Sequence, residues 1–459
     1  MTPPLAKAAS VLKRASPDRV RGLAPDSGAD DYLLRWVGCN VRDTRLRARF
    51  DSIAFDPQLM ARAAIHLTRN LRTSCAPILW ASGSYFIDAK GAIYLDFCAQ
   101  TQNLNFGHNH PYLVAAAAKF FASATPYYTS SRFGNLPCMR LAHELHRHLP
   151  WELNRINLKL LNGADAVETA FKSALQYHAK AGRERRKIIS LRWAHHGQTA
   201  MTMASSNKYA HLPYISCENN TYIDANDVSQ LRHHVSAAEG AAALILEPLQ
   251  MNGGAIQLTA AYMDEARRLC SREDVVLIFD EIQTAFGWTG KLFGFEHYGV
   301  VPDILCLSKA LASGFPLSAA IMREQYDTLD FGEAEYTGGL NPLSATIALA
   351  NLELLTTTPA MQNVAALARR LSDGLNRLRE RYPSWCREAR GLGLMQALQT
   401  RSYNIAKAVY DFALAAGVLL RISKNGWGET LLLKPALIVT PAQIDKVLGV
   451  MDDAFASLT

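Results

Sequence analysis

Short runs of apolar residues recur through the middle of the chain, separated by longer polar and amphipathic stretches. The runs lie at 157–161, 187–191, 241–248, 275–279 and 303–308. Strands that are buried on both faces of a parallel sheet have this character. Between two of the runs, AYMDEARRLCSRED (261–274) has the period of an amphipathic crossover helix. This order of strand, helix and strand predicts an α/β chain with a large, doubly wound and mostly parallel sheet.

The two ends of the chain have a different pattern from the middle. PILWASGSYFIDAKGAIYLDF (77–97) predicts two alternating strands around a turn at 88–91. From about residue 346, long amphipathic helices alternate with short strands, which predicts a smaller α+β domain. A chain of 459 residues also exceeds the size of a single core. We therefore predict an N-terminal arm and small antiparallel hairpin (1–104), a large α/β domain (105–345) and a C-terminal α+β domain (346–459).

Candidate chemistry lies at the ends of two neighbouring runs. VVLIF (275–279) is followed by Asp280 and Glu281, and the next run leads to Lys309 and a small-residue turn. Ligands of open α/β sheets bind at the carboxyl ends of the strands. An acid and a lysine there allow three interpretations: a structural ion pair, an ATPase strand, or a pyridoxal-phosphate site. The ATPase interpretation requires a GxxxxGK[ST] loop, which the sequence lacks.

DEIQTAFGWTG (280–290) together with PDILCLSKALASGFPLSA (302–319) closely resembles the cofactor region of class III aminotransferases. These are fold-type-I enzymes that depend on pyridoxal 5′-phosphate (PLP), and the resemblance spans roughly residues 75–455. It implies that Lys309 forms the Schiff base (internal aldimine) with PLP and moves the substrate proton. It also implies that Asp280 keeps the ring nitrogen protonated and that Gln283 hydrogen-bonds the ring 3-hydroxyl.

Four further cofactor contacts follow from the resemblance. Gly163 and Ala164 open a helix after the strand 157–161, where backbone N–H groups and the helix dipole favour a phosphate. His195 occupies the place of the aromatic residue that stacks on the pyridine ring, although it could also be a surface histidine. Glu247 belongs to the EPxQ segment at the rim. Thr337 falls where the family donates a hydroxyl to the phosphate of the opposite subunit, which implies a homodimer with active sites at the interface.

The resemblance implies a ping-pong reaction that moves an amino group from an amino acid or amine donor to a 2-oxo acid. A PLP-dependent decarboxylase, epimerase or aminomutase on the same scaffold is the alternative. The sequence departs from the family at the substrate: Leu432 replaces an arginine that binds carboxylate, and Asn252 replaces the glutamate that masks it. Arg421 and Lys434 are candidate replacement cations. GRTG is also altered, to GWTG at 287–290.

The composition limits the classes of ligand and binding partner that we expect for this chain. The formal charge of +7 comes from scattered Lys and Arg, which suits anionic small molecules and gives no indication of nucleic-acid binding. The eight cysteines form no CxxC pair, so we expect reduced thiols and a cytoplasmic protein. No run approaches about 18 apolar residues, so no membrane span is expected. His108 and His110 lack a suitably spaced third ligand, and we expect no metal site.

Overall fold

The computed structural model describes residues 68, 75–130, 132–236, 238, 240–423 and 428–458. Two compact units are distinguished by their internal contacts. The described residues of the first are mainly 75–95 and 108–111, and those of the second are 96–107 and 112–458. The arm that was predicted over residues 1–60 lies outside the described residues. The predicted boundaries at 104/105 and 345/346 stay predictions.

The first unit contains a small antiparallel sheet. Its strands are β1 (Ile78–Ser82), β2 (Tyr85–Asp88) and β3 (Ile93–Asp96). The predicted hairpin is β2 with β3, and its turn is closed by Asp88 Oδ1, which accepts from the amides of Lys90 and Ala92 at 2.9 Å each. The sequence prediction did not separate β1 from β2, because it overlooked the tight turn at Gly83, whose φ is 55°.

The second unit is built on a seven-stranded sheet in the order β4-β12-β11-β10-β7-β5-β6. Every neighbouring pair is parallel except the two that involve β12. The prediction of a doubly wound, mostly parallel sheet is confirmed. The strand bounds are β4 (Arg155–Leu160), β5 (Lys187–Leu191), β6 (Asn220–Ile223), β7 (Ala241–Leu246), β10 (Val276–Asp280), β11 (Ile304–Leu307) and β12 (Ser318–Met322).

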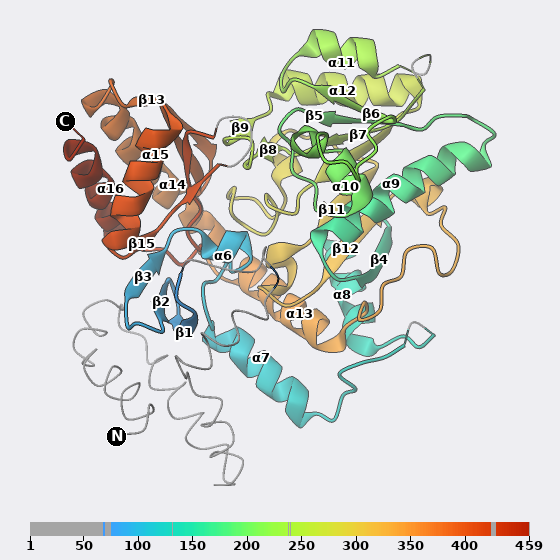
Figure 1. Cartoon of the computed structure of the whole chain (residues 1–459). Helices are drawn as coiled ribbons and strands as arrows, with labels where there is room; N and C mark the ends of the chain where they lie inside the picture. The colour runs from blue at the N-terminus through green and yellow to red at the C-terminus, as the bar shows by residue number, and fades with distance from the viewer. Residues whose placement is uncertain are drawn as a thin grey trace. The chain divides into compact units, whose positions relative to one another are not determined.

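Helices cover both faces of this sheet (Figure 1). α9 (Gly163–Lys180) packs Ala166, Ala170 and Phe171 against alternate residues of the central strands, among them Val276 and Ile278 of β10. α11 (Val228–His234) and α12 (Ala260–Glu273) lie together on the other face. The intervening residues of β10 are also fully buried, as expected for a strand that is covered on both sides.

A second, four-stranded antiparallel sheet follows in the order β13-β14-β17-β16. Its strands are β13 (Cys386–Leu392), β14 (Met395–Thr400), β16 (Arg421–Ile422) and β17 (Thr430–Leu433). α14 (Ala360–Arg381), α15 (Tyr403–Ala415) and α16 (Pro441–Ala456) accompany it. This agrees with the α+β character that was predicted for the C-terminal part.

The remaining elements are short or connect the two sheets. They are α6 (Ala99–Gln102), α7 (Pro111–Ala122), α8 (Leu136–Arg147), α10 (Ala200–Ala204), α13 (Pro342–Thr357), β8 (Leu249–Gln250), β9 (Ile256–Gln257) and β15 (Val418–Leu419). Several helices begin at a side-chain cap; Asn341, for example, accepts from the Ser344 amide at 2.9 Å at the start of α13. In the described part of the chain, none of the helices has the length and apolarity needed to cross a membrane.

Trp288, the altered position of the GRTG segment, is a fully buried structural residue. Its indole N–H donates to the Pro435 carbonyl at 2.9 Å, and its own carbonyl accepts from the Leu394 amide at 2.9 Å. The side chain therefore fastens the loop after β10 to the segment that follows β17.

We expect Trp288→Phe to lower the free energy of unfolding by about 1–3 kcal/mol, because the buried Pro435 carbonyl loses its donor. Denaturant unfolding of the purified protein measures this loss. Trp151→Phe is the matched control, since Trp151 is 76% exposed and should change stability little. Equal losses for the two variants would contradict a specific role for the indole hydrogen bond.

Candidate active site

Lys309 and Asp280 lie at the carboxyl ends of adjacent strands. β10 pairs with β11 in a register that places Asp280 beside Cys306, and Lys309 follows the end of β11. Lys309 has a left-handed backbone, with φ of 45°, and is half-buried on the cavity wall. Burial lowers the pKa of Lys309 to about 8, while the charges of Asp280 and Glu247 oppose that shift. Near neutral pH, a larger share of this lysine than of an ordinary lysine is therefore the neutral, nucleophilic amine.

A cavity of about 520 Å³ opens beside Lys309. Cations line it at Lys208, Lys309 and Arg421, and no Asp or Glu lines it among the residues that the structure describes. It is therefore suited to anionic groups. The predicted residues Asp280, Gln283, Glu247, Thr337 and Lys434 are not part of this lining. The lining residues are Asn162, Gly163, Ala164, His195, His196, Gly197, Gln198, Thr199, Lys208, Tyr209, Asn252, Ile282, Lys309 and Arg421.

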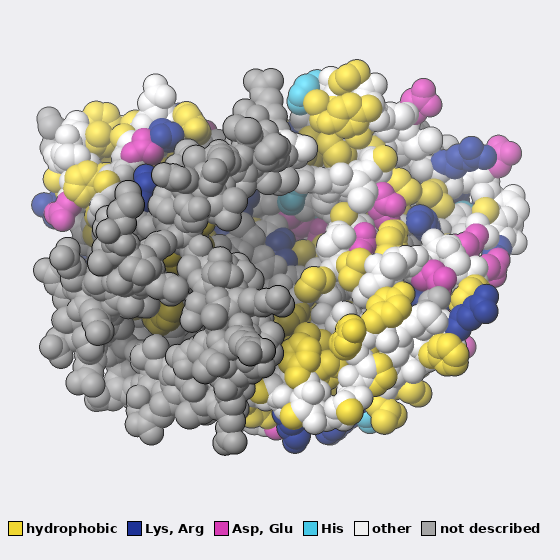
Figure 2. Space-filling model, turned by 60° about the horizontal axis from the view of Figure 1, so that its bottom comes forward, with side chains coloured by type: hydrophobic (Ala, Val, Ile, Leu, Met, Phe, Trp, Pro, Cys, Tyr) yellow, Lys and Arg dark blue, Asp and Glu magenta, His cyan; other side chains and the backbone are white. Residues whose placement is uncertain are grey.

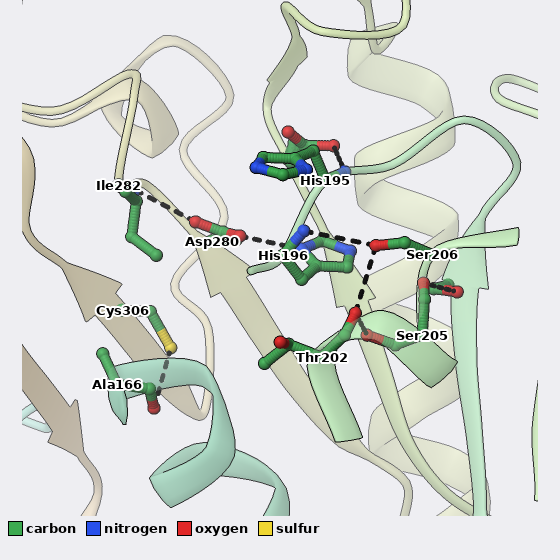
Figure 3. Close-up of polar contacts among 11 residues, drawn as sticks. Ala166, His195, His196, Thr202, Ser205, Ser206, Asp280, Ile282 and Cys306 are labelled. Atoms are coloured by element: carbon green, nitrogen blue, oxygen red, sulfur yellow. Dashed lines mark hydrogen bonds and ion pairs between the residues drawn. The ribbon is translucent and has the colours of Figure 1, made fainter. Parts of the chain in front are cut away.

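His196 holds the Asp280 carboxylate in place. Figure 3 shows the contact: His196 Nδ1 lies 2.7 Å from Asp280 Oδ2, and the Ile282 amide donates to the other carboxylate oxygen at 3.1 Å. The backbone of His196 is itself held by Ser206, whose hydroxyl accepts at 3.4 Å. His196 Nε2 is buried, has no protein partner, and belongs to a residue of the cavity wall. Sequence reasoning did not assign His196 a role, although it follows His195 directly.

His195 reaches the cavity as a neutral imidazole. Burial, followed by the charge of Lys309, lowers the pKa of His195 to about 3. Its backbone N–H donates to Glu247 Oε2 at 3.4 Å, and its Nδ1 is buried without a partner. An uncharged ring at this position can stack on a flat cofactor and still has one nitrogen that is free to hydrogen-bond.

Glu247 lies behind this histidine at the end of β7 and is buried. Burial, and next the charge of Asp280, raises the pKa of Glu247 well above its usual range. Its surroundings therefore favour the protonated form of Glu247. Asp280 is held by hydrogen bonds on both carboxylate oxygens.

Comparison with known proteins identifies this arrangement. A model of the aminotransferase class-III family matches residues 68–455. The chain belongs to the class-III aminotransferases. It is 34% identical to acetylornithine aminotransferase of Methanocaldococcus jannaschii over 82% of this chain and 92% of that protein. It is equally 34% identical to succinylornithine transaminase of Salmonella paratyphi A, over 79% of this chain and 88% of that one.

A solved structure agrees with these sequence relatives. The ornithine aminotransferase of Toxoplasma gondii superposes with a TM-score of 0.80 over 91% of this chain and 98% of that one, at 26% identity, and contains PLP at partial occupancy. The fold-type-I assignment, the aminotransferase activity and the PLP dependence that were expected from the sequence are confirmed. The decarboxylase, epimerase and aminomutase alternatives are not favoured.

The cavity wall of this aminotransferase fits PLP in its chemistry. Two buried histidine nitrogens without partners, on His195 and His196, are available to a polar aromatic ligand. Two glycines allow close packing at the opening of α9: a Cβ on Gly163 would lie 2.8 Å from Ile282, and one on Gly197 would lie 2.6 Å from the Ala164 Cβ. These positions tolerate no larger side chain without rearrangement.

The predicted phosphate site at Gly163 and Ala164 lies on the cavity wall, but one of its amides is already occupied. Asn162 caps α9, and its Oδ1 accepts from the Ala164 amide at 2.9 Å and from the Asp165 amide at 3.3 Å. A phosphate that binds there must share or displace this cap. The role of Gly163 and Ala164 stays a prediction.

The other predicted residues lie outside the cavity wall. The Gln283 carbonyl accepts from Gln102 Nε2 at 3.3 Å. Lys434 is buried and donates from Nζ to Gln102 Oε1 at 3.0 Å. Burial, followed by the charge of Arg421, lowers the pKa of Lys434 to about 7. Thr337 is exposed, in a loop that hydrogen-bonds to β4. Within the described residues, no three potential metal ligands come together.

We expect His196→Leu to lower kcat by about 10- to 150-fold, the range of one lost hydrogen bond to a charged group. His196→Asn should recover part of the rate, because its amide can still donate to Asp280. Steady-state kinetics measures the effect, and the cofactor absorption spectrum reports the state of the ring nitrogen.

His178→Leu is the matched control for this change. His178 is also buried and hydrogen-bonded, at 3.1 Å to the Ala242 carbonyl, and it belongs to α9 but does not line the cavity. It should lower the melting temperature without a change in the cofactor spectrum. A His196→Leu enzyme with an unaltered spectrum and rate would refute the positioning role.

Proposed function

We propose that this class-III aminotransferase carries out both half-reactions in the cavity beside Lys309, moving an amino group from an amino acid or amine donor to a 2-oxo acid. The half-buried Lys309 amine at the rim of a cavity with a cationic wall is the observation that carries this proposal. A lysine with a lowered pKa can act as a nucleophile and as a base near neutral pH. A cationic wall attracts the phosphate and carboxylate groups of the reactants.

PLP, when bound, supplies an aldehyde that takes up the amino group and a ring that accepts the electrons of the substrate carbanion. We assign Lys309 the proton transfer at the substrate carbon. Asp280, oriented by His196, would hold the proton on the ring nitrogen of PLP. His195 would stack on the ring as a neutral imidazole and Gln283 would hydrogen-bond the ring hydroxyl, while Glu247 accepts from the backbone of His195.

The remaining assignments concern the phosphate and the substrate. Gly163 and Ala164 would hold the phosphate at the N-terminus of α9, where the helix dipole favours an anion. Thr337 of a second subunit adds a hydroxyl. Relatives are named for acetylornithine and succinylornithine, so N-acylated ornithines are the first donors to examine. The described cysteines are all free thiols, which suits the cytoplasm.

Exposed apolar residues near Thr337 support a homodimer. The segment between α7 and α8 and the first turns of α8 expose large side chains, among them Phe133 (69%) and Leu136 (80%). Asn135 in this segment donates to the Leu340 carbonyl at 2.9 Å and so connects it to the Thr337 loop. Figure 2 shows hydrophobic side chains on the face where α7, α8 and α13 lie. Such a patch is typical of an interface between copies.

We expect a dimer in sedimentation equilibrium, and we expect Leu136→Asp to shift it towards monomer with a lower affinity for PLP. A charge at the centre of an apolar interface is costly to bury. Phe412→Asp, on α15, is the control for an added surface charge. A monomeric wild-type protein that binds PLP tightly and turns over would refute the shared site.

Reductive labelling tests the role of Lys309. Borohydride treatment of the PLP-bound protein should fix the cofactor to Lys309, and Lys309→Ala should be folded but inactive. Since the Lys309 pKa is about 8, PLP capture by the apoprotein should accelerate as the pH rises to about 8 and level off above it. Label on another lysine would overturn the assignment. Release of carbon dioxide without amino transfer would favour the decarboxylase alternative.

A further inference from the structure

The C-terminal sheet places two cations near Lys309, and neither has a carboxylate partner among the described residues. Arg421, on β16, lines the cavity, and within the described chain its guanidinium makes no hydrogen bond or ion pair. The ammonium of Lys434 is buried and donates to an uncharged oxygen, Gln102 Oε1, at 3.0 Å. Cations without counter-ions are costly to remove from water, so this pair favours the binding of an anion.

The strand register explains how Arg421 reaches this position. β16 pairs with β17 so that Arg421 stands directly opposite Leu432. Residues that are directly opposite in an antiparallel pair project from the same face, with Cβ atoms roughly 4.5–5.5 Å apart. Leu432 is fully buried and apolar. The Arg421 side chain therefore projects from the same face of the sheet as Leu432. It supplies a cation to that face, which the apolar Leu432 cannot do.

Lys434 belongs to the same face as Leu432, because side chains two residues apart point the same way along extended chain. The charge of Arg421 contributes to the lowered pKa of Lys434, and the charge of Lys309 adds to it, so the three cations lie within electrostatic reach of one another. A bound anion would relieve this mutual repulsion. Asp96 offsets part of this repulsion at Lys434, as Asp280 and Glu247 do at Lys309, whereas Arg421 has no ion pair among the described residues.

Asn252 adds a hydrogen-bond donor beside Arg421 on the cavity wall. It lines the cavity, and its carbonyl accepts from the Ser423 hydroxyl at 2.6 Å, which fastens its loop to the end of β16. As an amide, Asn252 cannot neutralise Arg421, but it can donate a hydrogen bond to an anion that Arg421 binds. A planar guanidinium with a neighbouring amide donor suits a planar carboxylate.

We propose that Arg421, with Asn252 beside it and Lys434 adding positive charge, binds the carboxylate that a 2-oxo acid shares with its amino acid. The pair β16/β17 thereby sets a preference for carboxylate-bearing substrates over simple amines and aldehydes. This inference rests on the proposed function of the cavity, because it names the substrate class of the same site.

Binding of unreactive carboxylates to the PLP-bound enzyme tests the inference without turnover. The probes are propionate and glutarate, followed by isothermal titration calorimetry. Arg421→Gln should weaken at least one of them by about 10- to 150-fold, the range for a lost charge-assisted pair. Arg401→Gln is the control, because Arg401 is exposed, donates to the Pro383 carbonyl and does not line the cavity. Unchanged affinity of Arg421→Gln for both probes would overturn the proposal.

A reciprocal exchange tests the strand register. Arg421→Leu combined with Leu432→Arg returns the guanidinium to the opposite strand on the same face. It should recover at least tenfold of the lost affinity, whereas Arg421→Leu alone should not. Thermal melting checks that the double variant is folded. If the double variant melts early, the single variants still decide the outcome.

Kinetics separates this inference from the proposed function. Arg421→Gln should lower the selectivity for amino acids over benzylamine, measured as the ratio of their kcat/KM values, by the same 10- to 150-fold, and its KM for 2-oxo acids should rise by a similar factor. Equal losses for benzylamine and for amino acids would indicate a general defect and refute a carboxylate anchor. If wild type transfers no amino group from any donor, the proposed function fails, and the titrations still test Arg421.

Discussion

The burial of an amine at the end of a parallel strand is the constraint on which the rest of the site depends. Lys309 is partly withdrawn from water, and this loss of hydration lowers its pKa to about 8. The same burial would be costly if no acid stood nearby. Asp280, at the end of the adjacent strand, supplies that charge, and the β10–β11 register holds the two strand ends side by side. Nucleophile and counter-charge thus result from a single strand pairing.

Two acids, Glu247 and Asp280, lie near the Lys309 amine, and their hydrogen bonds and burial differ. Glu247 is buried and is pushed towards its protonated form by its surroundings and by Asp280. Asp280 instead receives donors on both oxygens, from His196 and from the Ile282 amide. The two acids are therefore held differently: Glu247 lies in surroundings that favour its protonated form, and Asp280 is fixed by contacts on both oxygens.

Apolar run length and motif spacing were sufficient to predict the central strands, the parallel sheet and the Asp280–Lys309 pair. These features are local, or they follow from the chirality and connection rules of α/β chains. The contacts that were missed are long-range. His196 acquires its role only because β5 and β10 end near each other, and Arg421 faces Leu432 only through the β16/β17 register. The occupation of the Ala164 amide by Asn162 depends on a rotamer, which the helix-start pattern does not specify.

A strained turn connects the end of the C-terminal sheet, at Lys434, to the loop that follows Asp280. Four consecutive non-glycine residues, Ala99–Gln102, have φ between 45° and 65°, a conformation that costs roughly 1–2 kcal/mol per residue. Such a turn persists only where its surroundings compensate. Here Gln102 is fully buried and hydrogen-bonds at both ends, to Lys434 Nζ and to the Gln283 carbonyl.

That one side chain therefore joins the cation-bearing end of the C-terminal sheet to the loop that follows Asp280. Gln102 accepts from Lys434 at one end and donates to the Gln283 carbonyl at the other, so two hydrogen bonds connect the cation to the cofactor loop. The strained turn places the Gln102 side chain in a buried position between Lys434 and the cofactor loop. Its hydrogen bonds there do not compete with water. The C-terminal sheet and the loop after Asp280 are in this way connected through Gln102.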